Sequence, residues 1–231
     1  MDHPDYPRAS AYDPVWVWHH HMGPNVLWLT EALMSVVELR PGARVLDMGC
    51  GTAISSMFLA REFGVEVWAA DLWIDPTDNL RRVEEAGLSD AVFPLRVEAG
   101  NLPFADGFFD ALISVDSYHY FGMADDYLAT YARLARPGGR IGIVVPGRVA
   151  DIAYSDDETF RSPAWWKQHW SSGLVEVETA DTVPNGWDLW MRFVEASAAW
   201  DGQDTIVGQP DAQLLLDNPD LTFTRLVAVA R

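Results

Sequence analysis

Two aspartates and two glycines in the first half of the chain have the types and spacing of a nucleotide-binding site. Asp47, Gly49 and Gly51 follow the apolar segment of residues 44–46 and precede a segment with helical periodicity. Glycines at such a turn let the backbone approach a ligand closely, and the next helix begins with free N–H groups. Asp71 ends the next apolar segment, 20 residues after Gly51. A carboxylate at this spacing can bind the two hydroxyls of an adenosine ribose.

The glycine pattern departs from the one that binds dinucleotides. That pattern, G-x-G-x-x-G, requires a third glycine at position 54, where this chain has Ile54. Asp47 lies two residues before the first glycine, where it would repel a pyrophosphate and attract an ammonium group. The sequence therefore favours an adenosine ligand with a cationic amino-acid tail, which is S-adenosylmethionine.

The same segment resembles the class I S-adenosylmethionine-dependent methyltransferases, whose first motif is Asp/Glu-x-Gly-x-Gly. It is similar to the small-molecule branch of that family, which also contains ubiquinone-type and sterol-type methyltransferases. Three further segments resemble family motifs in the family's order, namely residues 98–104 (EAGNLPF), 108–114 (FFDALIS) and 134–139 (LARPGG). The resemblance covers about residues 40–146.

The resemblance implies a set of cofactor-binding positions. In chain order they are Asp47, Gly49, Gly51, Asp71, Leu72, Glu98, Ala99 and Ser114. The first three are expected at the methionine end, Asp71 at the ribose, Leu72 or Trp73 on the adenine face, Glu98 and Ala99 at the adenine edge, and Ser114 behind the ligand. Glu98 stands where the family usually has Asp, and Ala53 stands where many members have a third glycine.

The acceptor side is expected directly after the fourth strand. Asp116 and His119 are the candidates for substrate contact and catalysis, with His119 able to act as a general base. Alternatively, His119 only packs, since many methyltransferases need only proximity and orientation. The expected activity is methyl transfer to an O, N or S atom of a small molecule. The alternative is a non-methylating use of the cofactor, such as cyclisation of its aminobutyryl arm.

Alternating strand-like and helix-like segments must position these residues. Strands are expected at residues 44–48, 65–70, 91–97, 109–115, 140–145, 174–179 and 221–229, with helices at 25–39, 53–63, 75–85 and 125–135. This order predicts an α/β, Rossmann-like fold, with a seven-stranded, mostly parallel sheet, helices on both faces and an aromatic-rich cap. We expect a single domain over 1–231, with an N-terminal arm and helix (1–40), a cofactor-binding core (41–146) and a C-terminal part (147–231).

The two ends of the chain carry many aromatic residues. The arm contains Tyr6, Tyr12 and Trp16, and residues 180–220 exceed what a hairpin needs and contain Trp187 and Trp190. We expect the arm and this insertion to build an apolar acceptor pocket, with the arm acting either as a mobile lid or as a fixed filler of a groove. Three consecutive histidines (19–21) cannot all face one ion, so no metal is expected.

The amino-acid composition limits the kinds of molecule that the protein is expected to bind. The 34 acidic and 16 basic side chains give a formal net charge of −18, and Lys167 is the only lysine, which argues against nucleic acid. No apolar run reaches membrane-spanning length, and the N-terminal residues lack the pattern of a signal peptide. The single cysteine, Cys50, fits a reducing compartment. We therefore expect a cytoplasmic protein with a small-molecule partner, and the oligomeric state stays open.

Overall fold

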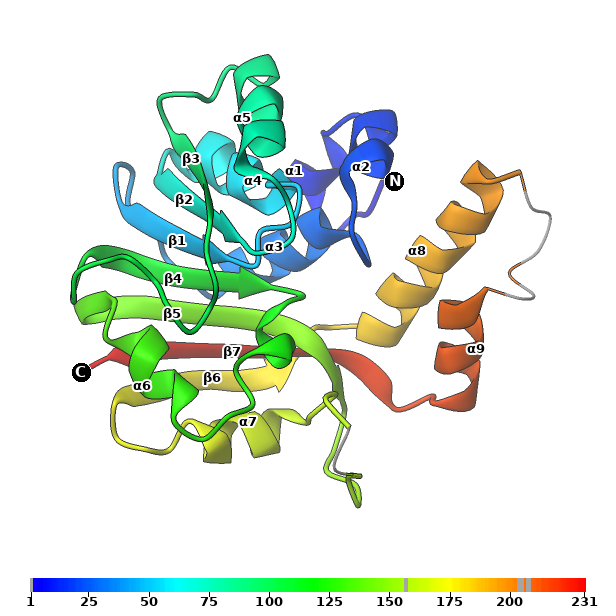
Figure 1. The fold of residues 1–231 in the computed structure, drawn as a ribbon. Helices are drawn as coiled ribbons and strands as arrows, with labels where there is room; N and C mark the ends of the chain where they lie inside the picture. The colour runs from blue at the N-terminus through cyan, green and yellow to red at the C-terminus, as the bar shows by residue number, and fades with distance from the viewer. Residues whose placement is uncertain (1, 156–157, 203–205, 207–208) are drawn as a thin grey trace.

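The centre of the molecule is a seven-stranded sheet (Figure 1). The structure, a computed structural model, describes residues 2–155, 158–202, 206 and 209–231. The strands are β1 (Arg44–Met48), β2 (Glu66–Asp71), β3 (Val92–Arg96), β4 (Phe109–Val115), β5 (Ala135–Arg148), β6 (Val175–Thr182) and β7 (Leu221–Ala230). Their order is β3-β2-β1-β4-β5-β7-β6, and only β7 pairs antiparallel, with β5 and β6. The expected seven-stranded, mostly parallel sheet is confirmed.

The inner strands are apolar because helices cover both faces of the sheet. Val45 and Leu46 of β1 and residues 111–115 of β4 are buried, a continuous run typical of parallel strands rather than an alternating one. Pro94 lies in β3, which is an edge strand of the sheet, so its missing N–H leaves no gap between two inner strands.

Helices form a layer on each face. They are α1 (Pro7–Ser10), α2 (Pro14–His20), α3 (Val26–Met34), α4 (Ile54–Phe63), α5 (Pro76–Glu85), the short 3-10 helix η1 (Tyr118–Tyr120), α6 (Tyr127–Ala132), α7 (Pro163–His169), α8 (Gly186–Trp200) and α9 (Pro210–Asp217). Figure 1 shows α3, α4 and α5 on one side of the sheet, and α6 and α7 on the other. Two buried hydrophobic clusters match these two layers.

Several element boundaries differ from the expectation: the helix expected over 25–39 ends at Met34, and the strand expected over 174–179 extends to Thr182. The boundary between α6 and β5 differs for a physical reason. The helix expected over 125–135 covers only Tyr127–Ala132, and β5 already begins at Ala135. Residues 137–139 therefore do not separate helix from strand. Gly138 has φ +77°, and the pairing of β4 with β5 shifts register between Phe109 and Ala111. The Pro-Gly-Gly sequence thus forms a bulge, after which the chain continues in the same ladder.

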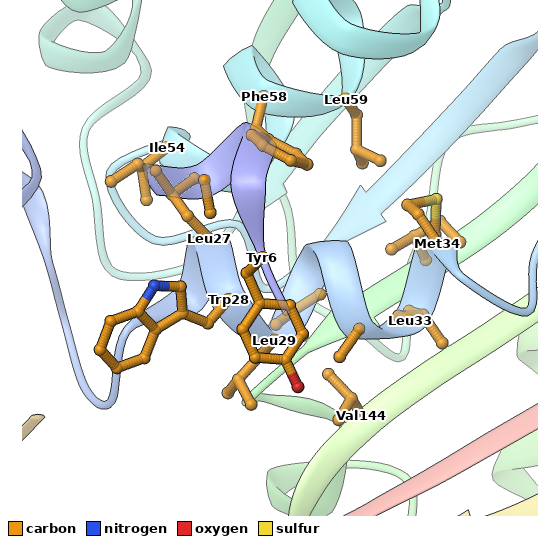
Figure 2. Close-up of a cluster of buried hydrophobic side chains, with 14 of the residues drawn as sticks. Tyr6, Leu27, Trp28, Leu29, Leu33, Met34, Ile54, Phe58, Leu59 and Val144 are labelled. Carbon is orange, nitrogen blue, oxygen red and sulfur yellow. The ribbon is translucent and has the colours of Figure 1, made fainter. Parts of the chain in front are cut away.

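The N-terminal arm fills a hydrophobic groove against α3 and α4. Tyr6 and Val17 are buried, and the ring of Tyr12 lies 5.5 Å from that of Phe58. Figure 2 shows Tyr6 among side chains of α3 and α4, including Trp28 and Phe58. In this structure the arm is part of the core.

No helix in the described part of the chain has the length and apolar character that a bilayer crossing needs.

Removal of residues 1–18 should destabilise the protein. Burial of each of the side chains of Tyr6 and Val17 contributes about 1.5–3 kcal/mol, so the free energy of unfolding should fall by at least about 3 kcal/mol. Urea unfolding followed by circular dichroism measures the change. An unchanged midpoint would contradict the packing of the arm.

Candidate active site

A cavity of about 490 Å³ opens at the carboxyl ends of the central strands. The turn after β1 lines it with Gly49 and Gly51. Asp71 at the end of β2, Glu98 after β3 and Asp116 after β4 also line it. Here β1 lies between β2 and β4 in the sheet, so successive crossovers leave in opposite directions. Ligands of open α/β sheets bind at such a switch point.

The glycine turn approaches the neighbouring loops too closely for any side chain. Gly49 has φ +76°, and a Cβ there would lie 2.3 Å from Ser117 Oγ. At Gly51, with φ +53°, a Cβ would lie 2.9 Å from Met22 Sδ. Ala53, where the family often has glycine, keeps the left-handed conformation with φ +62° and caps α4. The departure at this position therefore leaves the turn intact.

Asp71 joins the loops that follow β1 and β2. Its Oδ2 accepts a hydrogen bond from the Gly51 N–H (2.8 Å), and its Oδ1 accepts from the N–H groups of Trp73 (2.8 Å) and Ile74 (3.0 Å). The side chain is buried but belongs to the cavity wall. The position is suited to a carboxylate that binds a ribose, and that role stays a prediction.

Asp47 and Ser114 lie behind the cavity wall. Asp47 is fully buried, and its Oδ2 accepts hydrogen bonds from the hydroxyls of Ser55 and Ser56 at 2.6 Å. Burial raises the pKa of Asp47 to about 6, although both hydrogen bonds oppose this. The Ser114 Oγ lies 2.9 Å from the Met48 carbonyl oxygen and 2.8 Å from the Ser117 Oγ. Ser55 and Ser117, which do line the cavity, connect both residues to it.

Leu72, Glu98 and Ala99, which the resemblance places at the adenine, line the cavity, and their contact with the cofactor stays a prediction. Trp73 lies beside them with 69% of its surface exposed, and its ring is 5.9 Å from that of Tyr120. Tyr120 is 66% exposed. The sequence did not single out Tyr120, Phe121 or Tyr127 as site residues. All three line the cavity, and their signal was the run of aromatic residues after the fourth strand.

The two candidate catalytic residues are placed differently. Asp116 lines the cavity, whereas the buried His119 does not. Burial lowers the pKa of His119 to about 4, and its ring lies 4.0 Å from that of Tyr120 and 6.0 Å from that of Phe160. The catalytic role of His119 stays a prediction, and its absence from the residues that line the cavity does not favour that role.

Asp116 has an unusual backbone and environment. Its φ is +56°, and a Cβ at Gly23 would lie 2.5 Å from its Oδ2. Burial, followed by the charge of Asp211, raises the pKa of Asp116 to about 8. Within the described residues, no hydrogen bond or ion pair of this carboxyl is found.

The acceptor pocket expected from the arm and the insertion needs a correction. Met22 and Pro24, at the end of the arm, line the cavity, but no described residue of 180–220 does. Instead α8 supports the arm: the Trp18 ring lies 6.3 Å from that of Phe193 and 5.4 Å from that of Trp200. The helical spacing of the aromatic residues indicated a buried face, and that face packs on the arm and β7 rather than on the cavity.

Comparisons with known proteins agree with this architecture. A family model described as a methyltransferase domain matches residues 45–139. Methyltransferase GfsG of Streptomyces halstedii is 35% identical over 159 residues, which are 67% of this chain and 55% of that protein. The chain spans about half the length of the curated relatives it matches first. The chain belongs to the class I S-adenosylmethionine-dependent methyltransferase family.

Two solved structures share the fold of this methyltransferase-family chain. Geranyl diphosphate C-methyltransferase from Streptomyces coelicolor A3(2) has a TM-score of 0.74 and 16% identity, covering all of this chain (100%) and 94% of its own. The [4+2]-cyclase SpnF has a TM-score of 0.68 and 20% identity, covering 88% of this chain and 80% of its own. At these identities the likeness shows the fold alone.

Substitution of Gly49 should weaken binding of S-adenosylmethionine. In Gly49→Ala the new Cβ meets Ser117, so the turn must move, and we expect at least about tenfold weaker binding by calorimetry. Gly42→Ala is the matched control, because Gly42 has a similar φ of +77° and no atom within 4 Å of a Cβ. Equal affinities of the two variants would contradict the role of the turn.

Asp116 should make stability depend on pH. Its carboxyl has a higher pKa in the folded protein than the usual value of about 4, so the folded state holds the proton more tightly. Its stabilising contribution is complete below about pH 4 and is lost as the pH rises through about 8. Asp211 on α9 and the Tyr120 hydroxyl are the titratable groups that interact with it.

The measurement is urea unfolding of the wild type and Asp116→Asn across that pH range. The free energy of unfolding of the wild type should fall relative to that of the variant as the pH rises. Parallel curves would contradict the raised pKa.

Proposed function

We propose that the chain binds S-adenosylmethionine in the 490 Å³ cavity and methylates a small molecule. The observation that carries the proposal is the meeting of the glycine turn, Asp71 and the Glu98–Ala99 segment around one cavity at the switch point of the sheet. These are the positions to which the family motifs assign cofactor contact. A methyltransferase domain model that matches residues 45–139 supports the same activity.

The residues present fit this cofactor. Asp71 offers a carboxylate at the expected ribose, and Gly49 and Gly51 keep the turn open for the amino-acid end. Behind the wall of the cavity, the buried Oδ1 of Asp47 has no hydrogen-bond partner among the described residues. When bound, S-adenosylmethionine would supply a methyl group on a positively charged sulfur to a nucleophilic atom of the acceptor.

The protein's own contribution is orientation and exclusion of water. Met22, Val115, Phe121 and Tyr127 give the cavity an apolar wall that can align an acceptor and keep water from the reacting atoms. The proposed acceptor is a small molecule, and the site residues have the proposed roles given above. The proposed division of residues 1–231 is into arm (1–40), core (41–146) and C-terminal part (147–231).

The direct test is calorimetric titration of the protein with S-adenosylmethionine. Asp71→Asn removes the charge of a carboxylate, and hydrogen bonds to charged groups contribute about 1.5–3 kcal/mol, so we expect about 10- to 100-fold weaker binding. Asp90→Asn, on the surface, is the matched control and should bind as the wild type does. No binding by the wild type would refute the proposed function.

Mass analysis of the incubated cofactor separates transfer from the alternative use. S-Adenosylhomocysteine that forms only with an acceptor supports methyl transfer. Methylthioadenosine that forms without any acceptor would instead indicate cyclisation of the aminobutyryl arm.

A further inference from the structure

We propose that the acceptor is an amine with an apolar body, and that the Asp116 carboxylate pairs with its ammonium group and takes its proton. This inference rests on the proposed function, because it concerns the acceptor of the same cavity.

The charges of the cavity wall favour a cation. The ionisable carboxyls among the described lining residues are those of Asp71, Glu98 and Asp116, and no described lysine, arginine or histidine lines the cavity. The eight residues outside the description (1, 156, 157, 203–205, 207 and 208) are Met, Asp, Asp, Gln, Asp, Thr, Val and Gly, so none has a basic side chain. An anionic acceptor would find no counter-charge here, and the overall charge of −18 attracts cations.

Asp116 is separated by topology from the two carboxylates expected at the cofactor. Asp71 and Glu98 follow β2 and β3, on one side of β1 in the sheet, whereas Asp116 follows β4 on the other side. The glycine turn after β1 lies between them. Asp116 is therefore the carboxylate on the side of the cavity that remains for an acceptor.

The environment of Asp116 lacks the hydrogen-bond donors and the positive charge that normally stabilise a buried structural carboxylate. Its left-handed backbone (φ +56°) holds the side chain beside Gly23, and no described group donates a hydrogen bond to it. The nearby charge of Asp211 opposes its ionisation. An ammonium group beside Asp116 would favour its ionised form, whereas a neutral alcohol would not.

Aromatic side chains complete the environment for a cation. Tyr120, Phe121 and Tyr127 line the same cavity, and ring faces attract ammonium groups. The Tyr127 hydroxyl is buried and has no hydrogen-bond partner in the described part of the chain. A bound polar ligand would provide one.

The proton and electron balance of the step is complete. The ammonium N–H proton passes to the Asp116 carboxylate, which frees the nitrogen lone pair. That lone pair forms the new N–C bond to the methyl carbon, and the electron pair of the broken C–S bond stays on sulfur. The ammonium group favours the ionised form of Asp116. Because burial raises the pKa of this carboxyl, its carboxylate is a stronger base than that of an ordinary aspartate.

The test is calorimetric binding of three pairs of probes to the protein saturated with S-adenosylhomocysteine. The amines are benzylamine, 2-phenylethylamine and octylamine, and each is compared with the alcohol of the same body. We expect at least one amine to bind at least about tenfold more tightly than its alcohol. This preference should disappear in Asp116→Asn and persist in Asp90→Asn. Amines that bind no better than alcohols, or do not bind at all, would overturn the proposal.

A second measurement tests whether Asp116 interacts with the positive charge of the cofactor instead of with the acceptor. Affinities for S-adenosylmethionine, with its positive sulfur, and for neutral S-adenosylhomocysteine are compared in the wild type and Asp116→Asn. An unchanged ratio supports a role toward the acceptor, and a ratio that changes about tenfold or more would overturn it. If neither compound binds the wild type, the proposed function itself fails, which is distinct from a failure confined to the amine.

Discussion

The hydrogen bonds of the Asp71 carboxylate determine the shape of the site. Strands β1 and β2 are paired so that Met48 lies beside Ala70, and both strands therefore end at the same level. One carboxylate can then bind the N–H of Gly51 after β1 and those of Trp73 and Ile74 after β2. A shift of one residue in the pairing would turn this side chain to the other face of the sheet. The cavity thus depends on the register of two strands.

The N-terminal arm also determines the position of the cavity wall, because it contacts the loops after β1 and β4. The Thr52 hydroxyl donates a hydrogen bond to the carbonyl oxygen of His20, which ties the glycine turn to the end of α2. Met22 then lies against Gly51, and Gly23 lies against Asp116. A side-chain carbon on either glycine would force the neighbouring side chain to move. The arm therefore holds both halves of the cavity together, and α8 supports it from behind through Trp18.

The sequence predicts the part of the cavity proposed for the cofactor better than the part proposed for the acceptor. Asp47, the glycine turn and Asp71 lie within 25 consecutive positions (47–71), so local pattern and strand pairing suffice to bring them together. Met22 and Tyr120 instead meet through long-range packing, which no local period encodes. The apolar residues of 187–198 recur at helical spacing, but this spacing does not show what the buried face of α8 packs against. The glycines of 137–139 could signal either a stop or a bulge.

Asp116 combines two costs that a purely structural residue would avoid. A left-handed backbone costs a residue other than glycine about 1–2 kcal/mol. Its carboxyl is also disfavoured in the charged form by burial and by the charge of Asp211, and no described residue donates a hydrogen bond to it. Strain of this kind persists where the surrounding structure enforces it and where function uses it. Here the arm and β4 enforce it, and a cation in the cavity would relieve the electrostatic part. A positively charged acceptor would favour the ionised form of Asp116 and pair with it.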